Sequence, residues 1–122
     1  TRLRVSGRYK MIEGLFSTGM PFGGRSDLPE TLKELGRLLP VCSGVRRFGA
    51  AALDLAYVAA GRYDGFWERN LNAWDIAAGV IIVKEAGGLV EPVTQGHNII
   101  EDGEVICAND AMFSQLAKIV RA

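Results

Sequence analysis

The stretch Trp74-Asp75-Ile76-Ala77-Ala78-Gly79 decides the fold of this chain. It places one carboxylate at the start of an apolar segment of small residues that continues to Gly87-Gly88. This density of apolar residues predicts a buried helix over residues 73–86, ended by the glycine pair. A second acid, Glu68, stands seven residues before Asp75. One acid therefore precedes the helix, and another lies in its first turn.

Strand and helix patterns alternate along the rest of the chain. Short apolar runs predict strands, and longer segments with apolar residues at helical spacing predict helices. The expected strands are residues 12–17, 45–48, 64–68, 89–93 and 105–108, and the expected helices are residues 28–39, 50–60, 73–86 and 111–120. The alternation predicts an α/β fold with a mixed, largely parallel sheet flanked by helices. Helices 50–60 and 73–86 are apolar nearly all round, so we expect both to be buried.

The composition is that of a globular domain with no bias toward one class of partner. A chain of 122 residues is long enough for one sizeable core. The 14 basic and 14 acidic residues cancel, so the net charge gives no indication of nucleic-acid binding, although Arg46-Arg47 is a local basic patch. No apolar run reaches the roughly 20 residues of a membrane span. Cys42 and Cys107 are too few for a disulfide scaffold and indicate free thiols in a reducing, cytoplasmic setting.

Asp75 has two interpretations on local sequence. Hydrolysis of phosphate esters at neutral pH uses divalent cations, and hard cations such as Mg²⁺ take carboxylate oxygens, so Asp75 could be a metal ligand. Alternatively, Asn72 is the N-cap, and Asp75, three residues later, completes a capping-box-like pair and interacts with the helix dipole. Taken alone, the local sequence favours capping.

Three other positions also have two interpretations each. Glu68 ends a predicted strand, where open α/β sheets bind ligands, or it pairs with Arg69 or Arg62 on the surface. The run Gly49-Ala50-Ala51 starts a helix without a side-chain cap, so its amides could approach a ligand, or its small residues could serve close packing. His97, the only histidine, sits in a polar turn and is expected to face solvent, which argues against a Ser-His or Cys-His catalytic pair.

The order of these features resembles the second signature of the inositol monophosphatase family. The resemblance covers nearly the whole chain, and its residues are Phe66-Trp67-Glu68-Arg69, Trp74–Gly79, Gly87-Gly88 and the upstream run Val45–Asp54. The family's first signature, an Asp-Pro-x-Asp-Gly-Thr run that carries most of the metal ligands, is absent from this sequence. The resemblance therefore implies the carboxyl-terminal half of such an enzyme. Residues 11–122 would form its α/β domain, and residues 1–10 would form the junction to an amino-terminal half.

The resemblance implies Mg²⁺-dependent hydrolysis of a small phosphomonoester by the complete enzyme, a homodimer. It makes Asp75 the metal ligand, against the local preference for capping. It makes Glu68 the acceptor for substrate hydroxyls, and the two oxygens of a carboxylate suit a vicinal diol. Gly49 and Ala51 would contact substrate through the backbone, and Asn72 would face it, although a plain N-cap stays open for Asn72. Beyond the metal ligand, no catalytic residue is expected in this half.

The second hypothesis is a noncatalytic protein-interaction module. Bacterial relatives of the family have been linked to transcription-machinery partners, and Arg37, Arg46 and Arg47 would be candidate contacts. For the enzyme, the expected partners are the phosphomonoester and the amino-terminal half, with no membrane and no nucleic acid. The wider superfamily handles inositol phosphates, sugar bisphosphates, nucleotide phosphates and histidinol phosphate, and the loop from Glu68 to Asp75 looks closest to bacterial inositol monophosphatases.

Overall fold

The computed structural model describes residues 3–19, 28–47 and 50–122. Its strands are β1 (Leu15–Thr18), β2 (Gly44–Arg46), β3 (Gly65–Glu68), β4 (Leu89–Glu91) and β5 (Val105–Ala108). Its α-helices are α1 (Leu28–Leu38), α2 (Ala51–Ala59), α3 (Ala73–Glu85), α4 (Ile99–Asp102) and α5 (Phe113–Val120). Two short 3-10 helices are η1 (Met11–Glu13) and η2 (Leu39–Val41). The expected alternation is confirmed. The short helix α4 was not foreseen, and the first expected strand begins later because its first residues form η1.

The five strands form one mixed sheet in the order β2-β1-β3-β5-β4. β1 pairs in parallel with β2 and with β3, whereas β5 is antiparallel to both β3 and β4. A mixed sheet flanked by helices is what the sequence predicted. Because β1, β2 and β3 are parallel, their carboxyl ends lie at the same edge of the sheet.

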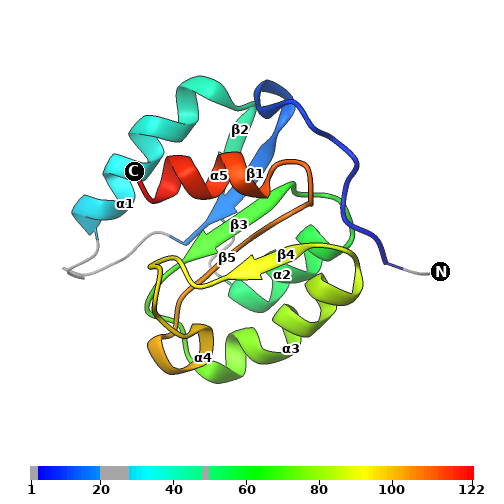
Figure 1. The fold of residues 1–122 in the computed structure, drawn as a ribbon, viewed down its shortest axis with the longest axis vertical. Coiled ribbons are helices and arrows are strands. Elements are labelled where there is room, and N and C mark those ends of the chain that lie inside the picture. Colours follow the sequence, from blue (N-terminus) through cyan, green and yellow to red (C-terminus); the bar gives the residue numbers. More distant parts are fainter. Residues whose placement is uncertain (1–2, 20–27, 48–49) are drawn as a thin grey trace.

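Helices cover both faces of the sheet, with α1 and α5 on one face and α2 and α3 on the other (Figure 1). Side chains alternate between the faces along each strand, so β3 contributes to two cores. Trp67 packs in the core under α1 and α5, and Phe66 packs in the core under α2 and α3. Each residue of β3 therefore has a fixed face.

α2 and α3 pack closely against each other, but their outer faces are open. A Cβ atom on Gly79 would lie 2.5 Å from Leu55 Cδ1, so the absence of a side chain at Gly79 allows the contact. The prediction that both helices are buried is wrong for the outer face of α3, where Trp74 is 92% exposed and Ile81 57% exposed. Apolar residues surround this helix, but in the described chain only one of its faces has a packing partner.

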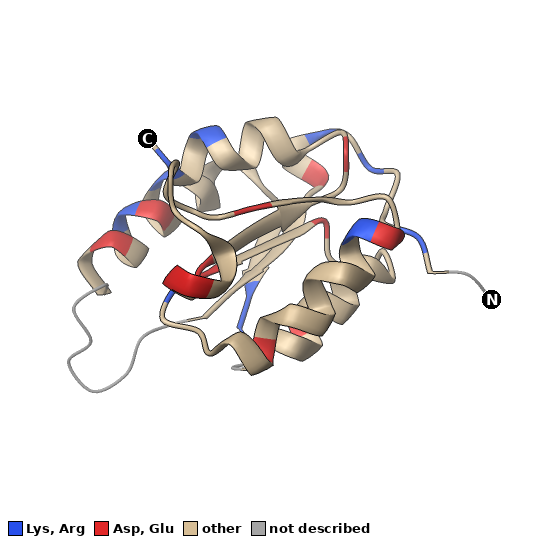
Figure 2. Ribbon diagram, turned by 60° about the horizontal axis from the view of Figure 1, so that its bottom comes forward, with Lys and Arg blue, Asp and Glu red and all other residues tan. Residues whose placement is uncertain are grey.

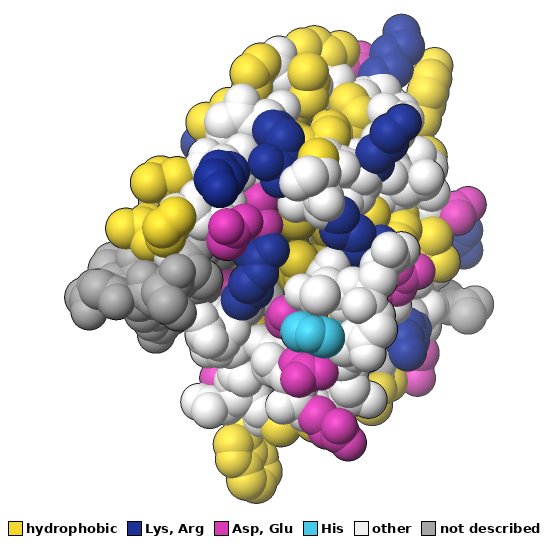
Figure 3. All heavy atoms as spheres, turned by 60° about the vertical axis from the view of Figure 1, so that its left-hand side comes forward, with side chains coloured by type: hydrophobic (Ala, Val, Ile, Leu, Met, Phe, Trp, Pro, Cys, Tyr) yellow, Lys and Arg dark blue, Asp and Glu magenta, His cyan; other side chains and the backbone are white. Residues whose placement is uncertain are grey.

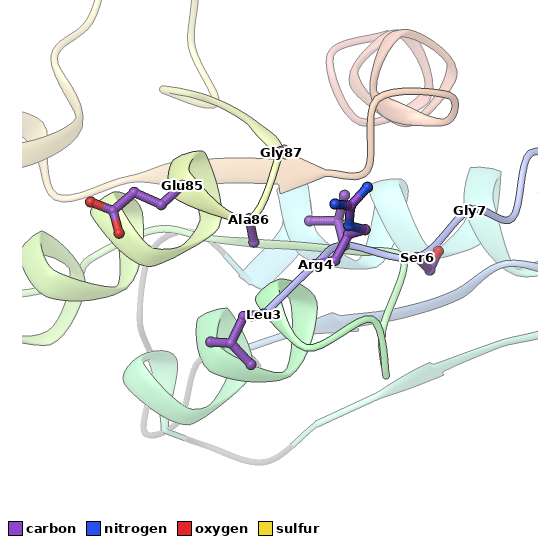
Figure 4. A pocket seen from close by; sticks show the side chains of 8 residues that line it. Leu3, Arg4, Ser6, Gly7, Glu85, Ala86 and Gly87 are labelled. Atoms are coloured by element: carbon purple, nitrogen blue, oxygen red, sulfur yellow. The ribbon is translucent and has the colours of Figure 1, made fainter. Parts of the chain in front are cut away.

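Residues 3–10 run past the end of α3 and form no helix or strand. The Val5 N–H donates to the Ala86 carbonyl at 3.0 Å. A cavity of about 430 Å³ lies between this segment and the end of α3 (Figure 4). Because α3 begins at Ala73, the cavity is at the opposite end of the helix from Asp75, and it does not belong to the predicted site.

A buried carboxylate, Asp64, anchors residues 3–10 to the domain. Asp64 accepts hydrogen bonds from the Ser6 hydroxyl, from Arg8 Nε at 2.8 Å and from the Leu15 N–H at 2.8 Å. Asn109 Nδ2 donates to Ser6 Oγ, also at 2.8 Å. These donors compensate the cost of taking a carboxylate out of water.

We expect Asp64→Ala to lower the free energy of unfolding by about 2–4 kcal/mol, because it leaves partly buried donors unpaired. Arg8 is 42% exposed at its side chain and can be rehydrated, so the loss comes chiefly from Ser6 and Leu15. Urea denaturation followed by tryptophan fluorescence measures the change. The exposed Asp110→Ala is the control, and a loss at Asp64 within the surface range of about 0.5 kcal/mol would contradict the anchor.

Candidate functional site

The carboxyl ends of β1 and β3 and the starts of α2 and α3 share one edge of the sheet. α2 follows β2 and α3 follows β3, so the chain enters both helices from that edge. Open α/β sheets bind ligands outside the carboxyl ends of their strands. Glu68 is the last residue of β3, Asp75 lies in the first turn of α3, and Ala51 is the first residue of α2. The topology thus places three predicted site residues from different elements at this edge.

Asp75 is exposed at the start of α3, and its backbone N–H donates to the Asn72 carbonyl at 3.0 Å. Asn72 occupies the N-cap position with extended backbone, yet among the described residues its side chain makes no capping hydrogen bond. The structure therefore does not support a side-chain capping box. Of the two ways in which Asp75 could stabilise the helix, only the attraction between its carboxylate and the helix N-terminus is left.

Glu68 is half-buried and packs over the backbone of Gly19, the residue directly after β1. A Cβ atom on Gly19 would lie 2.0 Å from Glu68 Cδ, so a larger residue there would displace the carboxylate. The neighbouring Thr18 hydroxyl donates to the Trp67 carbonyl at 2.7 Å. The ends of β1 and β3 are therefore joined closely at the point where Glu68 stands.

Glu34 of α1 is a buried acid that the sequence did not reveal. It is 1% exposed, and its Oε1 accepts hydrogen bonds from Trp67 Nε1 at 2.9 Å and from Arg69 Nη1 at 3.0 Å. Arg69 Nη2 donates to the other oxygen, which makes the ion pair bidentate. Arg69, which the local sequence suggested as a surface partner of Glu68, therefore has a buried partner, Glu34, on another helix.

The start of α2 has no side-chain cap, as expected. Ala50 is in the N-cap position, and its carbonyl accepts from the Leu53 N–H at 3.0 Å. Ala51 is buried, so its contact with a ligand would be through backbone atoms. Gly49, the other predicted contact in this turn, lies outside the described residues.

Asp54 in α2 is a second buried acid that sequence reasoning missed. Its Oδ1 accepts from the Ser17 hydroxyl at 2.6 Å, and its Oδ2 has no hydrogen-bond partner among the described residues. Burial raises the pKa of the Asp54 carboxyl, and the hydrogen bond from Ser17 opposes this rise. A protonatable acid therefore connects α2 to the end of β1.

His97 faces solvent, as predicted. Its Nδ1 lies 3.2 Å from Glu104 Oε1 and 4.0 Å from Asp102 Oδ2, and Figure 3 shows the histidine beside acidic side chains. The chain's two cysteines are free and buried, and burial raises the pKa of the Cys107 thiol to about 12. Across residues 3–19, 28–47 and 50–122, no group of three or more His, Cys, Asp or Glu side chains could hold a metal ion.

Charged residues of both signs are interspersed over the helices (Figure 2). Arg37, a candidate protein contact, has a structural role because its guanidinium donates to the carbonyls of Ile119 at 2.7 Å and Val120 at 3.0 Å. Arg46 and Arg47, at the end of β2, are exposed. In the described part of the chain, no helix has the length and apolar character needed to cross a membrane.

The chain resembles known proteins over almost its full length. The model of the inositol monophosphatase family matches residues 1–122. An inositol-1-monophosphatase of Mesorhizobium japonicum is 48% identical over 120 residues, which are 98% of this chain and 45% of that protein. A Nus factor SuhB of Pseudomonas aeruginosa is 46% identical over 122 residues, again 98% of this chain and 45% of that protein.

Solved structures agree with this result. The crystal structure of extragenic suppressor protein suhB from Bartonella henselae has a TM-score of 0.92 at 44% identity and covers 98% of this chain and 46% of that chain. An inositol monophosphatase from Anabaena has a TM-score of 0.84 at 36% identity, with 97% of this chain and 47% of that chain covered. The chain spans about half the length of the curated relatives it matches.

Proposed function

We propose that this chain, which belongs to the inositol monophosphatase family, is part of a Mg²⁺-dependent phosphomonoesterase for inositol monophosphate or a related small sugar phosphate. The observation that carries the proposal is the placement of two acids, Glu68 at the end of β3 and Asp75 in the first turn of α3, at one edge of the sheet. Relatives named inositol-1-monophosphatase support the same reaction. The complete protein would act in the cytoplasm as a homodimer.

Asp75 is assigned as a metal ligand. It is exposed, it stands on the first turn of a packed helix, and its carboxylate supplies the hard oxygen donors that Mg²⁺ prefers. When bound, Mg²⁺ would neutralise charge on the phosphate and activate water. The other ligands would come from a segment equivalent to the remaining half of the relatives, because the described residues offer no acidic cluster around Asp75.

The substrate wall is assigned to Glu68 and to the starts of the two helices. Glu68, seated on Gly19, would accept hydrogen bonds from hydroxyls of the sugar or cyclitol. Gly49 and Ala51 would present backbone groups to the substrate, since the first amides of a helix without a side-chain cap are open donors. Asn72 is exposed before α3 and would face the same ligand.

A noncatalytic protein-interaction role is the second candidate function, because relatives of similar identity are named Nus factor SuhB. The exposed Arg46 and Arg47 are the candidate contacts, whereas the Arg37 guanidinium already donates to carbonyls of α5. Co-purification of the protein with transcription machinery, lost in Arg46→Glu and kept in Asp75→Asn, would support this role.

We expect the isolated 122-residue chain to show no phosphatase activity, because it would bring a single metal ligand to the phosphate. Adding the amino-terminal half should restore Mg²⁺-dependent turnover. Release of inorganic phosphate from inositol 1-phosphate measures both cases, with the amino-terminal half alone as the control. Robust hydrolysis by the isolated chain would contradict the division of the site between two segments.

A further inference from the structure

We propose that Glu34 of α1 is a positioning residue for Glu68, so that a buried ion pair on the far face of the sheet sets how the site reads substrate hydroxyls. The inference rests on the proposed function, because it takes Glu68 as the acid that binds the substrate. Glu34 lies on the Trp67 face of the sheet, opposite the face that carries Phe66. Its carboxylate acts through the two residues that flank Glu68 in the chain.

The geometry of the contact is specific to these flanking residues. Glu34 accepts from the Trp67 indole N–H at 2.9 Å and holds both terminal nitrogens of Arg69. Trp67 belongs to the core under α1 and α5, and side chains alternate along a strand, so Glu68 points to the opposite face, toward α2 and α3. Glu34 therefore fixes the chain immediately before and immediately after Glu68.

The regular strand ladder is interrupted directly after Glu68. The last pair between β3 and β5 is Glu68 with Val105, so Arg69 lies beyond the strand ladder. The next residue, Asn70, has a φ of 60°, in the left-handed region, and the Leu71 N–H then donates to the Gly103 carbonyl at 2.8 Å, before β5. The bidentate pair with Glu34 fixes Arg69 between the ladder and Asn70.

The carboxylate of Glu68 also depends on a close fit on its own side. It packs against Gly19, and the Thr18 hydroxyl holds the Trp67 carbonyl at 2.7 Å. A small shift of the segment 67–69 would move the carboxylate off Gly19 and away from the substrate. Misplacement of a binding group by about 1 Å can lower rates by about a hundredfold, so a remote contact can have a measurable effect.

If Glu34 served packing alone, burying its carboxylate would cost free energy that an apolar side chain would not cost. Apolar residues of similar volume often replace buried ion pairs with no loss of stability. Glu34 is 1% exposed on a helix face that packs on the core, and Arg69 is only 21% exposed at its side chain. The Glu34 carboxylate accepts directional hydrogen bonds from Trp67 and Arg69, which an apolar side chain could not do.

The test is Glu34→Gln in the complete enzyme, which keeps one acceptor for Trp67 and removes the charge pair with Arg69. We expect kcat/KM on inositol 1-phosphate to fall about fivefold to twentyfold, chiefly through KM. On p-nitrophenyl phosphate, which lacks adjacent hydroxyls, the change should be below about twofold, and the Mg²⁺ dependence should not move. Glu30→Gln, one turn away and exposed, is the matched control and should behave as wild type.

A double-mutant cycle with Glu68→Gln separates positioning from a general loss of stability. If Glu34 acts through Glu68, adding Glu34→Gln to Glu68→Gln should cause little further loss. Equal losses on both substrates, additive losses in the cycle, or no loss in Glu34→Gln would each overturn the inference. Arg69→Lys, which keeps the charge but loses the bidentate geometry, should show the same substrate-selective loss if Glu34→Gln does not fold.

A readout independent of catalysis distinguishes this inference from the proposed function. The Trp67 indole N–H and the Glu68 backbone amide should both shift in the NMR spectrum of Glu34→Gln, while the indole of Trp74, which is 92% exposed, stays in place. If Glu68→Gln retains full activity on both substrates, the proposed role of Glu68 fails. The positioning contact then stands if both resonances shift and falls if the Glu68 amide does not.

Discussion

Asp75→Asn in the complete enzyme should lower kcat by about a hundredfold or more and raise the Mg²⁺ concentration needed for half-maximal rate. The amide keeps the shape of the side chain but loses the charge that binds the cation. Asp75 is exposed, and its neighbour Asn72 makes no side-chain cap within the described chain, so the loss of stability should stay below about 1 kcal/mol.

Steady-state kinetics across a Mg²⁺ series, together with urea denaturation, measures both quantities for Asp75→Asn. Glu85→Gln is the matched control, because Glu85 is exposed on the same helix at its other end. A variant that loses about 1 kcal/mol of stability, as a lost helix cap would, and yet keeps its activity would show that Asp75 serves the helix and not the metal.

The second large effect is expected for Glu68→Gln. The amide keeps one acceptor oxygen but loses charge-assisted hydrogen bonds to hydroxyls, each worth about 1.5–3 kcal/mol. Catalytic efficiency on inositol 1-phosphate should therefore fall about tenfold to a hundredfold. A phosphate ester without adjacent hydroxyls should be affected little, and the Mg²⁺ optimum should be unchanged.

Parallel kinetics on the two substrates tests this assignment, with the exposed Glu101→Gln on α4 as the control. If both substrates lose efficiency equally in Glu68→Gln, or if the Mg²⁺ optimum shifts, Glu68 belongs to the metal shell and does not read hydroxyls. The Glu68 carboxylate packs closely against Gly19, and Gln has nearly the same shape and should occupy the same position. The variant therefore tests the charge of Glu68 without moving its side chain.

A mixed sheet flanked by helices and the placement of the acids could be predicted because they depend on local patterns, whereas the strand order was not predicted. Short apolar runs bounded by glycines specify strands, and the order of elements then places Glu68 at a strand end and Asp75 at a helix start. The family assignment is confirmed over residues 1–122. The roles of Asp75, Glu68, Ala51 and Asn72 in binding stay predictions.

Long-range partners explain what the sequence did not predict. Leu32 and Leu39, in the segment predicted as helix 28–39, are 53% and 51% exposed. Glu34 is buried instead, because Trp67 and Arg69, more than 30 residues away, satisfy its carboxylate. No local pattern reports such a pair, since an acid in a helix is normally read as a solvent-facing position.

The most direct test of the account is a Mg²⁺ titration of inositol 1-phosphate hydrolysis by the complete protein, with and without a chelator. Turnover should saturate with Mg²⁺, disappear in chelator and return when Mg²⁺ is added in excess. Asp75→Asn should shift this titration to higher Mg²⁺, whereas Glu85→Gln should leave it in place. Hydrolysis that persists in chelator, or no hydrolysis at any Mg²⁺ concentration, would contradict the proposed function.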